Sequence, residues 1–283
     1  MPELPEVEVL ARHLRPLIRG RTIRGVNVQR AKVLRPTSLR VFRKTLQGAK
    51  FTGVTRRGKY LLFQLRLRSN REPMTLLGHL GMTGRIYLAR KNERLPGHAA
   101  VVLDLGGENL IYEDTRYFGR LTLDVSAVKK LGPEPLADGF DRAAFARSLK
   151  RSRQAIKVRL LDQTLVAGIG NIYAGEALFR ARISPRLPAR KLTVAQVKRL
   201  WRAIREILGE AIAHGSTVPL NFGRNSSDGL FYFGRAPGAP DYYEERLRVY
   251  DREGRPCYRC RSLIRRIQQA GRSTFYCPGC QQA

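Results

Sequence analysis

Acidic side chains are scarce in this 283-residue chain, in which 23 Asp and Glu stand against 53 Lys and Arg, a formal net charge of +30. Such an excess of one charge destabilises a compact state through self-repulsion, so it indicates a polyanionic partner. The basic residues are spread along the chain and do not gather in one tail or one amphipathic helix. That distribution favours nucleic acid over a membrane surface. A generally basic proteome or a ribosome-associated role is the alternative.

Long apolar runs are also missing, and no segment approaches the roughly 20 residues that cross a bilayer. The first twenty residues are charged and lack the apolar centre of a signal peptide. We therefore expect no membrane contact and a cytoplasmic, nucleoid-associated location. The hydrophobic fraction of 43% is sufficient for proper cores, and the length suits two domains.

Cysteine is absent until the last 27 residues, which contain all four. They form two CxxC pairs, Cys257 with Cys260 and Cys277 with Cys280, separated by sixteen residues. Four thiolates at this spacing suit one tetrahedral zinc ion with no open position, which makes the site structural. Two disulfides or an iron centre are the alternatives. Four arginines lie between the pairs and match phosphate geometry: Arg261, Arg265, Arg266 and Arg272.

Hydrophobic periodicity predicts an α+β chain. Helical spacing runs from Glu6 to Ile18, and Gly20 ends it. Alternation then predicts strands at 61–67 and 121–125, and a hairpin joins 101–105 to 110–112. We interpret residues 1–131 as an N-terminal helix followed by an antiparallel β-sandwich or barrel.

A helical domain is expected from residue 132 to residue 243, because Gly132-Pro133 continues neither strand nor helix. Helices are predicted at 154–162 and 171–181, and another begins at Thr193, where Thr193 and Gln196 form a capping box. The stretch 218–243 is rich in Gly, Pro and aromatics and reads as a long loop. Residues 244–283 form the four-cysteine finger.

The N-terminus combines an unusual amine with nearby acids. Removal of Met1 would leave Pro2 with a free secondary amine, whose pKa of about 8 keeps roughly a tenth of it unprotonated at neutral pH. Glu3 and Glu6 supply carboxylates within one helical turn. A covalent nucleophile with acid–base partners is one interpretation. An ordinary helix start, with Pro5 in the first turn, is the other.

Five motifs in this order resemble the bacterial formamidopyrimidine-DNA glycosylase family, which removes 8-oxoguanine and ring-opened purines from DNA. They are residues 2–6 (PELPE), 58–60 (GKY), 79–84 (HLGMTG), 168–173 (GIGNIY) and the four-cysteine finger. The resemblance covers nearly the whole chain. It implies a β-sandwich domain, a helix–two-turn–helix domain with a zinc-finger hairpin, one structural Zn²⁺, and damaged double-stranded DNA as substrate. We also expect the protein to be a monomer.

The resemblance also implies roles for individual residues. Pro2 attacks the anomeric carbon and forms an iminium, Glu3 is general acid and base, and Glu6 orients the amine. Lys59 transfers a proton in the first elimination, and Arg272 matches an arginine linked to the second, which we read as a phosphate clamp because its pKa exceeds 12. The implied DNA contacts are Met82, His98, Arg116, Phe118, Arg153, Lys157 and Asn171. Of these, Met82, Arg116 and Phe118 fill the gap left by the flipped base, with core packing as the alternative for Met82 and Phe118.

Two departures from the family pattern stand out. Tyr117 occupies a position that usually carries a second basic residue, and the loop from Leu220 to Tyr243 is longer and more aromatic than the usual base-capping loop. Two other functions remain open. One is an endonuclease VIII-like glycosylase for oxidised pyrimidines. That family usually has Gly where this chain has Leu4 and lacks the HLGM segment, so both features disfavour it. The other is a non-catalytic damaged-DNA-binding module, which has no need of Pro2, Glu3 and Lys59.

Overall fold

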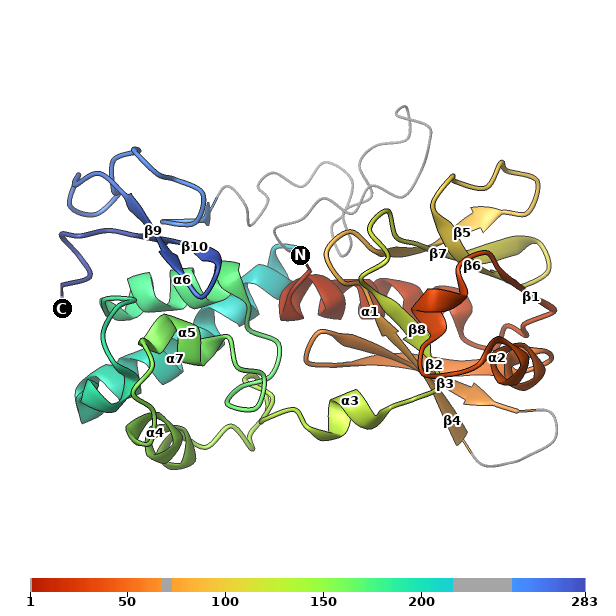
Figure 1. Cartoon of the computed structure of the whole chain (residues 1–283), viewed down its shortest axis with the longest axis horizontal. Coiled ribbons are helices and arrows are strands. Elements are labelled where there is room, and N and C mark those ends of the chain that lie inside the picture. Colours follow the sequence, from red (N-terminus) through yellow and green to blue (C-terminus); the bar gives the residue numbers. More distant parts are fainter. Residues whose placement is uncertain (1, 68–72, 216–245, 283) are drawn as a thin grey trace. The chain divides into compact units, whose positions relative to one another are not determined.

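The computed structural model describes residues 2–67, 73–215 and 246–282. These residues form two compact units, 2–129 and 130–215 together with 246–282. Figure 1 shows that strands dominate the first unit, whereas the second consists of helices and one short hairpin. The predicted α+β class is therefore confirmed. The finger shares one unit with the helices, and its folding as a separate domain stays a prediction.

The first unit contains two antiparallel four-stranded sheets. One has the order β1 (Gly25–Val28), β6 (Ala99–Asp104), β7 (Glu108–Glu113), β5 (Arg85–Arg90). The other has the order β2 (Lys50–Arg57), β3 (Tyr60–Arg66), β4 (Pro73–His79), β8 (Arg120–Thr122). Side chains from both sheets, among them Phe63, Leu76, Leu103 and Leu110, line one small apolar cavity, so the core lies between the sheets.

Helix α1 (Leu4–Ile18) packs on the second sheet, which places its N-terminus beside the strands. Leu4, Val7, Leu10 and Leu14 are buried at helical spacing. Arg15 Nε donates to the Val54 carbonyl at 3.0 Å, and the helix stops where Gly20 takes a positive φ of 84°. The predicted helix and its glycine stop are confirmed.

One prediction for this unit needs correction, and two short helices were not predicted. The strand expected at 121–125 is only three residues long, because the chain turns at Asp124, whose carboxylate accepts from Ser126. The sequence also gives no sign of η1 (Ala31–Leu34) and α2 (Leu39–Leu46). Helix α2 has only eight residues and buries only Phe42 and Leu46, so it lacks the longer run of apolar residues by which a helix is recognised in a sequence.

The second unit contains α4 (Arg142–Lys150), α5 (Ile156–Leu160), α6 (Asn171–Ala181), η2 (Ala189–Lys191) and α7 (Val194–Ala213), and α3 (Ser126–Lys129) precedes it. Helix α6 and the Thr193–Gln196 capping box of α7 are as predicted, but α5 is shorter than 154–162. Strands β9 (Arg265–Gln269) and β10 (Arg272–Tyr276) form the finger hairpin. The predicted loop 218–243 lies outside the described residues.

Candidate active site and nucleic-acid interface

The start of α1 buries both predicted acid–base carboxylates. Glu3 and Glu6 are 1% and 0% exposed and form a capping box, in which the Glu3 N–H donates to Glu6 Oε2 at 2.8 Å. Pro2 is buried beside them. The helix-start interpretation is therefore correct, and it does not compete with the chemical one. The same cap fixes two carboxylates within one turn of Pro2.

Lys59 lies in the two-residue turn between β2 and β3 and is only 7% exposed. Gly58 supplies the positive φ of 56° that this turn needs. Arg56 ties the turn to α1, since its Nη1 donates to the Gly58 carbonyl at 3.0 Å and its Nε to Glu8 Oε2 at 2.9 Å. The hairpin carrying Lys59 is thus fastened to the helix that begins at Pro2 and Glu3.

The negative charge of Glu8 is stabilised where Arg56 links the hairpin to α1. Burial raises the pKa of Glu8, but hydrogen bonds and positive charge from Arg12 and Arg56 outweigh it and leave the pKa below its usual value. Glu8 therefore remains ionised at neutral pH and keeps its pairing with Arg56.

Met82 and Phe118 are exposed surface residues, so core packing is the wrong interpretation for both. Their exposed fractions are 46% and 54%. The Arg116 guanidinium lies 4.9 Å from the centre of the Phe118 ring. The loops that carry them touch, because a Cβ on Gly81 would come within 2.7 Å of the Gly119 nitrogen. A thioether, a guanidinium and an aromatic ring are therefore presented together from adjoining loops.

Asp114 holds these two loops together, a role that the sequence did not reveal. Its buried carboxylate accepts from Thr83 Oγ1 at 2.7 Å, from the Arg116 N–H at 3.2 Å and from the Gly119 N–H at 2.8 Å. One side chain thus connects the loop after Met82 with the loop that contains Arg116 and Phe118. The available signal was the second of two adjacent acids, Glu113 and Asp114, at the end of an apolar strand in a strongly basic chain.

Asp114→Asn is expected to loosen both loops. An amide NH₂ would face an N–H or hydroxyl donor at one of the two oxygen positions, which leaves buried donors unpaired and costs about 2 kcal/mol of unfolding free energy. Denaturant unfolding of the purified variant measures this. Thr83→Val, which removes one donor only, is the matched control and should cost less. An Asp114→Asn variant as stable as wild type would contradict the role.

His79 is partly buried against the same region. Its ring centre lies 4.7 Å from that of Tyr60, and its Nδ1 accepts from the Gly81 N–H at 3.2 Å. Burial lowers the pKa of His79 to about 4, with help from the charges of Lys59 and Arg120 and against the charge of Asp114. The ring is therefore neutral in the folded protein at neutral pH and can accept from the backbone.

This neutral histidine makes stability depend on pH. In the unfolded chain His79 titrates near 6.5, so between pH 6.5 and 4 the unfolded state binds more protons than the folded state. The stabilisation is complete above pH 6.5 and is lost as the pH falls towards 4, by about 3 kcal/mol. Denaturant unfolding of wild type and His79→Asn across this range tests it, since His13 titrates in both. Parallel curves would contradict the assignment.

In the second unit, a chain of contacts connects two helices to the finger. Lys157 is fully buried and its Nζ donates to Asn171 Oδ1, while Asn171 Nδ2 donates to the Ser273 carbonyl of β10 at 2.9 Å. Arg153 and Arg272 are exposed, and Arg272 follows the tight Ala270-Gly271 turn of the hairpin. Lys157 is thus placed to position Asn171, whereas Arg153 and Arg272 face solvent.

Glu176 fastens the segment that leads into the finger, a role that no local sequence pattern predicts. Its carboxylate accepts from the backbone N–H groups of Arg248, Val249 and Tyr250 at 2.9–3.0 Å. Burial raises the pKa of Glu176, and these three donors oppose the rise. The finger is therefore joined to α6 at Glu176 as well as at Asn171.

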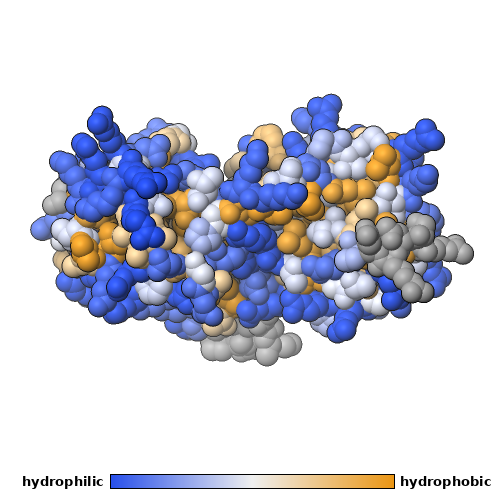
Figure 2. Space-filling model, turned by 90° about the horizontal axis from the view of Figure 1, so that it is seen from below, coloured by the Kyte–Doolittle hydropathy of each residue, from blue (hydrophilic) through white to orange (hydrophobic). Residues whose placement is uncertain are grey.

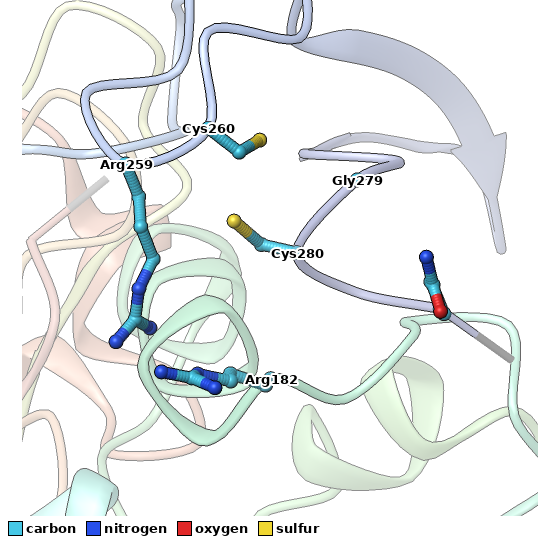
Figure 3. A pocket seen from close by; sticks show the side chains of 6 residues that line it. Arg182, Arg259, Cys260, Gly279 and Cys280 are labelled. Carbon is cyan, nitrogen blue, oxygen red and sulfur yellow. The ribbon is translucent and has the colours of Figure 1, made fainter.

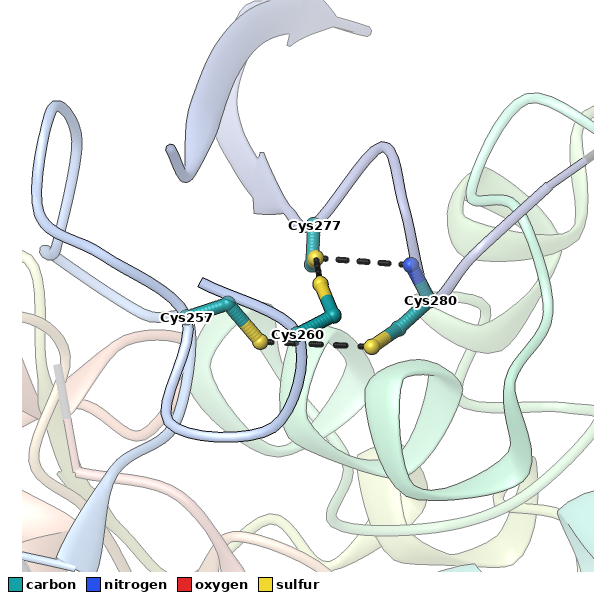
Figure 4. Close-up of side chains that lie close together, drawn as sticks. All are labelled: Cys257, Cys260, Cys277 and Cys280. Atoms are coloured by element: carbon teal, nitrogen blue, oxygen red, sulfur yellow. Dashed lines mark hydrogen bonds between the residues drawn. The ribbon is translucent and has the colours of Figure 1, made fainter. Parts of the chain in front are cut away.

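The four cysteines converge as a metal site requires (Figure 4). Their sulfur atoms all lie within 4.8 Å of one another, and the cysteines are free. The Sγ atoms of Cys257 and Cys280 are 3.9 Å apart and those of Cys260 and Cys277 are 3.3 Å apart, well beyond a disulfide bond of about 2.05 Å. These separations suit the edges of a tetrahedron of thiolates, so the residues fit one structural zinc ion.

An open hollow of about 460 Å³ adjoins the cysteines, and Arg182 and Arg259 extend into it beside Cys260 and Cys280 (Figure 3).

Hydrophilic side chains cover much of each unit on the face shown in Figure 2. Among the described residues, no helix is long and apolar enough to cross a membrane.

Comparison with known proteins covers the chain from end to end. The family model for the formamidopyrimidine-DNA glycosylase N-terminal domain matches residues 1–121, and that for its H2TH domain matches 131–221. A zinc finger found in FPG and IleRS matches 254–283. The formamidopyrimidine-DNA glycosylase of Thermus thermophilus is 43% identical, covering 99% of this chain and 98% of its own.

The solved structures that resemble this chain include proteins of the same family. Lactococcus lactis Fpg in complex with DNA containing an abasic site has a TM-score of 0.87 at 34% identity, over 99% of this chain and 100% of that one. The same protein with DNA containing an oxidised pyrimidine has a TM-score of 0.87 at 34% identity over both whole chains. Fold and site together define a DNA-repair glycosylase with a structural zinc finger. Within that class, the chain belongs to the formamidopyrimidine-DNA glycosylase family.

Proposed function

We propose that this chain is a bifunctional DNA glycosylase and abasic-site lyase that excises 8-oxoguanine and formamidopyrimidines from double-stranded DNA. One observation carries the proposal. Two buried carboxylates, Glu3 and Glu6, are held by a capping box within one turn of Pro2. A helix start alone needs no such pair of buried acids, whereas a nucleophilic amine needs acid–base partners at its side.

In the proposed first step, the Pro2 nitrogen uses its lone pair to form a bond to C1′ of the damaged nucleotide. The bond from C1′ to the base breaks, its electron pair leaves with the base, which takes up a proton from water, and the Glu3 carboxylate removes the proton of the Pro2 nitrogen. Glu3 then donates a proton to O4′ as the C1′–O4′ bond opens, which leaves an iminium between Pro2 and C1′. Glu6, hydrogen-bonded to the Glu3 backbone, keeps the cluster in place.

Strand cleavage follows from the iminium, which withdraws electrons and acidifies the C2′ hydrogen. Loss of that proton expels the 3′ phosphate, and a second elimination expels the 5′ phosphate. Lys59, nearly buried beside α1, is the proposed proton carrier of the first elimination. Arg272 on the exposed hairpin turn is the proposed clamp for a flanking phosphate.

Base extrusion costs a few kcal/mol, and the vacated space must be filled. Met82, Arg116 and Phe118 are the proposed filling residues, and their exposure supports this. His98, Arg153 and Asn171 are proposed phosphate contacts, with Lys157 acting through Asn171. We also propose that the protein is a cytoplasmic, nucleoid-associated monomer.

Paired single-turnover kinetics test the substrate class. Duplexes that differ only in carrying 8-oxoguanine, thymine glycol or an abasic site are incubated with the protein, and base release and nicking are measured. We expect the protein to nick the abasic duplex. We also expect it to release the damaged base at least about tenfold faster from the 8-oxoguanine duplex than from the thymine glycol duplex. The opposite order would favour the pyrimidine-directed alternative. Absence of base release and nicking, with Met1 retained in the intact mass, would favour the binding module.

A further inference from the structure

One end of the sheet β1-β6-β7-β5 brings together three segments that are distant in sequence. The register pairs Val28 of β1 with Val101 of β6, and Ala99 of β6 with Glu113 of β7. The end of β1, the approach to β6 and the loop after β7 therefore emerge side by side. Arg30, His98 and Tyr117 lie on these three segments.

Backbone hydrogen bonds fix the three segments to one another. The Arg30 N–H donates to the Ala100 carbonyl at 3.2 Å, and the Asp114 N–H donates to the His98 carbonyl at 3.1 Å. Asp114 in turn holds the loop that contains Tyr117, through the N–H groups on either side of it at Arg116 and Gly119. The cluster of Arg30, His98 and Tyr117 thus has a rigid base.

Tyr117 is the centre of this cluster. Arg30 Nε donates to its hydroxyl at 3.2 Å, and the Arg30 guanidinium lies 5.6 Å from its ring centre. His98 Nδ1 lies 3.5 Å from the same hydroxyl, with the two rings edge to face. Tyr117 has a φ of 54°, which is uncommon for a bulky residue, costs about 1–3 kcal/mol and persists only because the surrounding contacts hold it.

Only part of the Arg30 guanidinium is used within the protein. Nε is committed to Tyr117, and over the described ranges Nη1 and Nη2 have no hydrogen-bond partner. Arg30 and His98 are both exposed. A planar guanidinium that is fixed at Nε and open at both terminal nitrogens is oriented for bidentate contact with a phosphate.

We propose that Arg30, oriented by Tyr117 and flanked by His98, binds a backbone phosphate of duplex DNA next to the residues that fill the extruded base's place. Tyr117 has no charge where the family pattern usually has a second basic residue, and Arg30 supplies that charge from the segment that follows β1. Arg116 and Phe118 flank Tyr117 in sequence, so the phosphate belongs to the duplex close to the lesion. The inference rests on the proposed function, because it assigns one further contact of that same DNA site.

Salt-dependent binding to a duplex with a non-cleavable abasic analogue tests the inference without requiring any chemistry. The affinity is measured from 50 to 200 mM salt for wild type, Arg30→Gln, Tyr117→Phe and Arg43→Gln. Arg43→Gln is the matched control, since it removes the same charge from exposed Arg43 on α2 of the same unit. Thermal midpoints confirm that each variant is folded.

Arg30→Gln should make the slope of log affinity against log salt concentration shallower by about 0.9, because each neutralised phosphate contributes about that much to the slope. It should also weaken binding at 50 mM salt about tenfold. Tyr117→Phe keeps the ring but removes the hydroxyl, and should weaken binding about threefold. Arg43→Gln should leave the slope unchanged. Equal slopes for Arg30→Gln and Arg43→Gln would overturn the inference. A Tyr117→Phe variant that binds like wild type would overturn the orienting role of Tyr117.

The same measurement distinguishes failure of the Arg30 contact from failure of DNA binding as a whole. If wild type binds with a steep salt dependence and Arg30→Gln matches it, only the Arg30 contact is wrong. If wild type itself shows a flat dependence, the basic surface does not bind DNA, and the proposed function fails with it.

Discussion

Replacing Glu3 by Gln is expected to slow base release by a factor of about a hundred or more, because positioned general acid–base groups contribute about 10²–10⁴ in rate. The amide keeps the length and shape of the side chain but can neither remove the proton of the Pro2 nitrogen as the base leaves nor pass a proton to O4′. The rate at which Glu3→Gln nicks a preformed abasic site should fall less than its rate of base release, because the base has already left. Single-turnover base release and nicking, measured in parallel on the two duplexes, give both numbers.

The capping role of Glu3 requires a structural control. Its side chain accepts from the Glu6 N–H, so any substitution also disturbs the start of α1. Glu3→Asp keeps a good capping carboxylate but withdraws it by one methylene from the reacting atoms. A Glu3→Asp variant with a wild-type thermal midpoint and strongly reduced base release would separate chemistry from capping. Full activity in Glu3→Gln would contradict the acid–base role.

Loss of zinc should have the other large effect, the unfolding of the finger hairpin and a fall in duplex affinity of at least about a hundredfold. Structural zinc contributes about 10–16 kcal/mol in finger peptides, and that binding energy is folding energy. Cys277 is completely buried, so Cys277→Ala removes a ligand and a packed side chain together. Metal analysis should find one zinc per chain in wild type and none in this variant.

The unfolding should remain local. The finger buries Val249, Ile264 and Phe275 against Phe179 of α6, and Gln281 Nε2 donates to the Ile183 carbonyl at 3.0 Å. These contacts are lost with the hairpin, whereas α7 has its own buried face. Hydrogen exchange should accelerate over 265–276 and change little over 194–213.

Chelation followed by zinc addition is the control for irreversible damage. The exchange pattern and the affinity should both return when zinc is restored to the wild-type chain. Protection of 265–276 that survives complete removal of the metal would contradict a finger held by zinc.

Sequence reasoning succeeded where the signal is local. The glycine stop after α1, the Thr193–Gln196 capping box and the two CxxC pairs each specify a geometry within a few residues, and the structure contains all three. The exposure of Met82 and Phe118 could not be read locally, because an apolar side chain in a loop is compatible with a core or a surface position.

The positions that sequence reasoning missed depend on tertiary contacts. Asp114 joins two loops 31 residues apart through Thr83, and Arg30 reaches Tyr117 across 87 residues. Glu176 accepts from backbone groups more than 70 residues away. No periodicity or spacing encodes such pairings. They arise because sheet register and the packing of α6 on the finger bring the partners together.

Borohydride trapping tests the central claim, that Pro2 is the nucleophile, most directly. The protein is incubated with an 8-oxoguanine duplex, reduced and digested, and mass spectrometry locates the DNA adduct. The account predicts an adduct on the Pro2 nitrogen in a chain that has lost Met1. An adduct on Lys59 would keep the lyase but contradict the nucleophile, and no adduct with either oxidised-purine or abasic DNA would contradict covalent catalysis altogether.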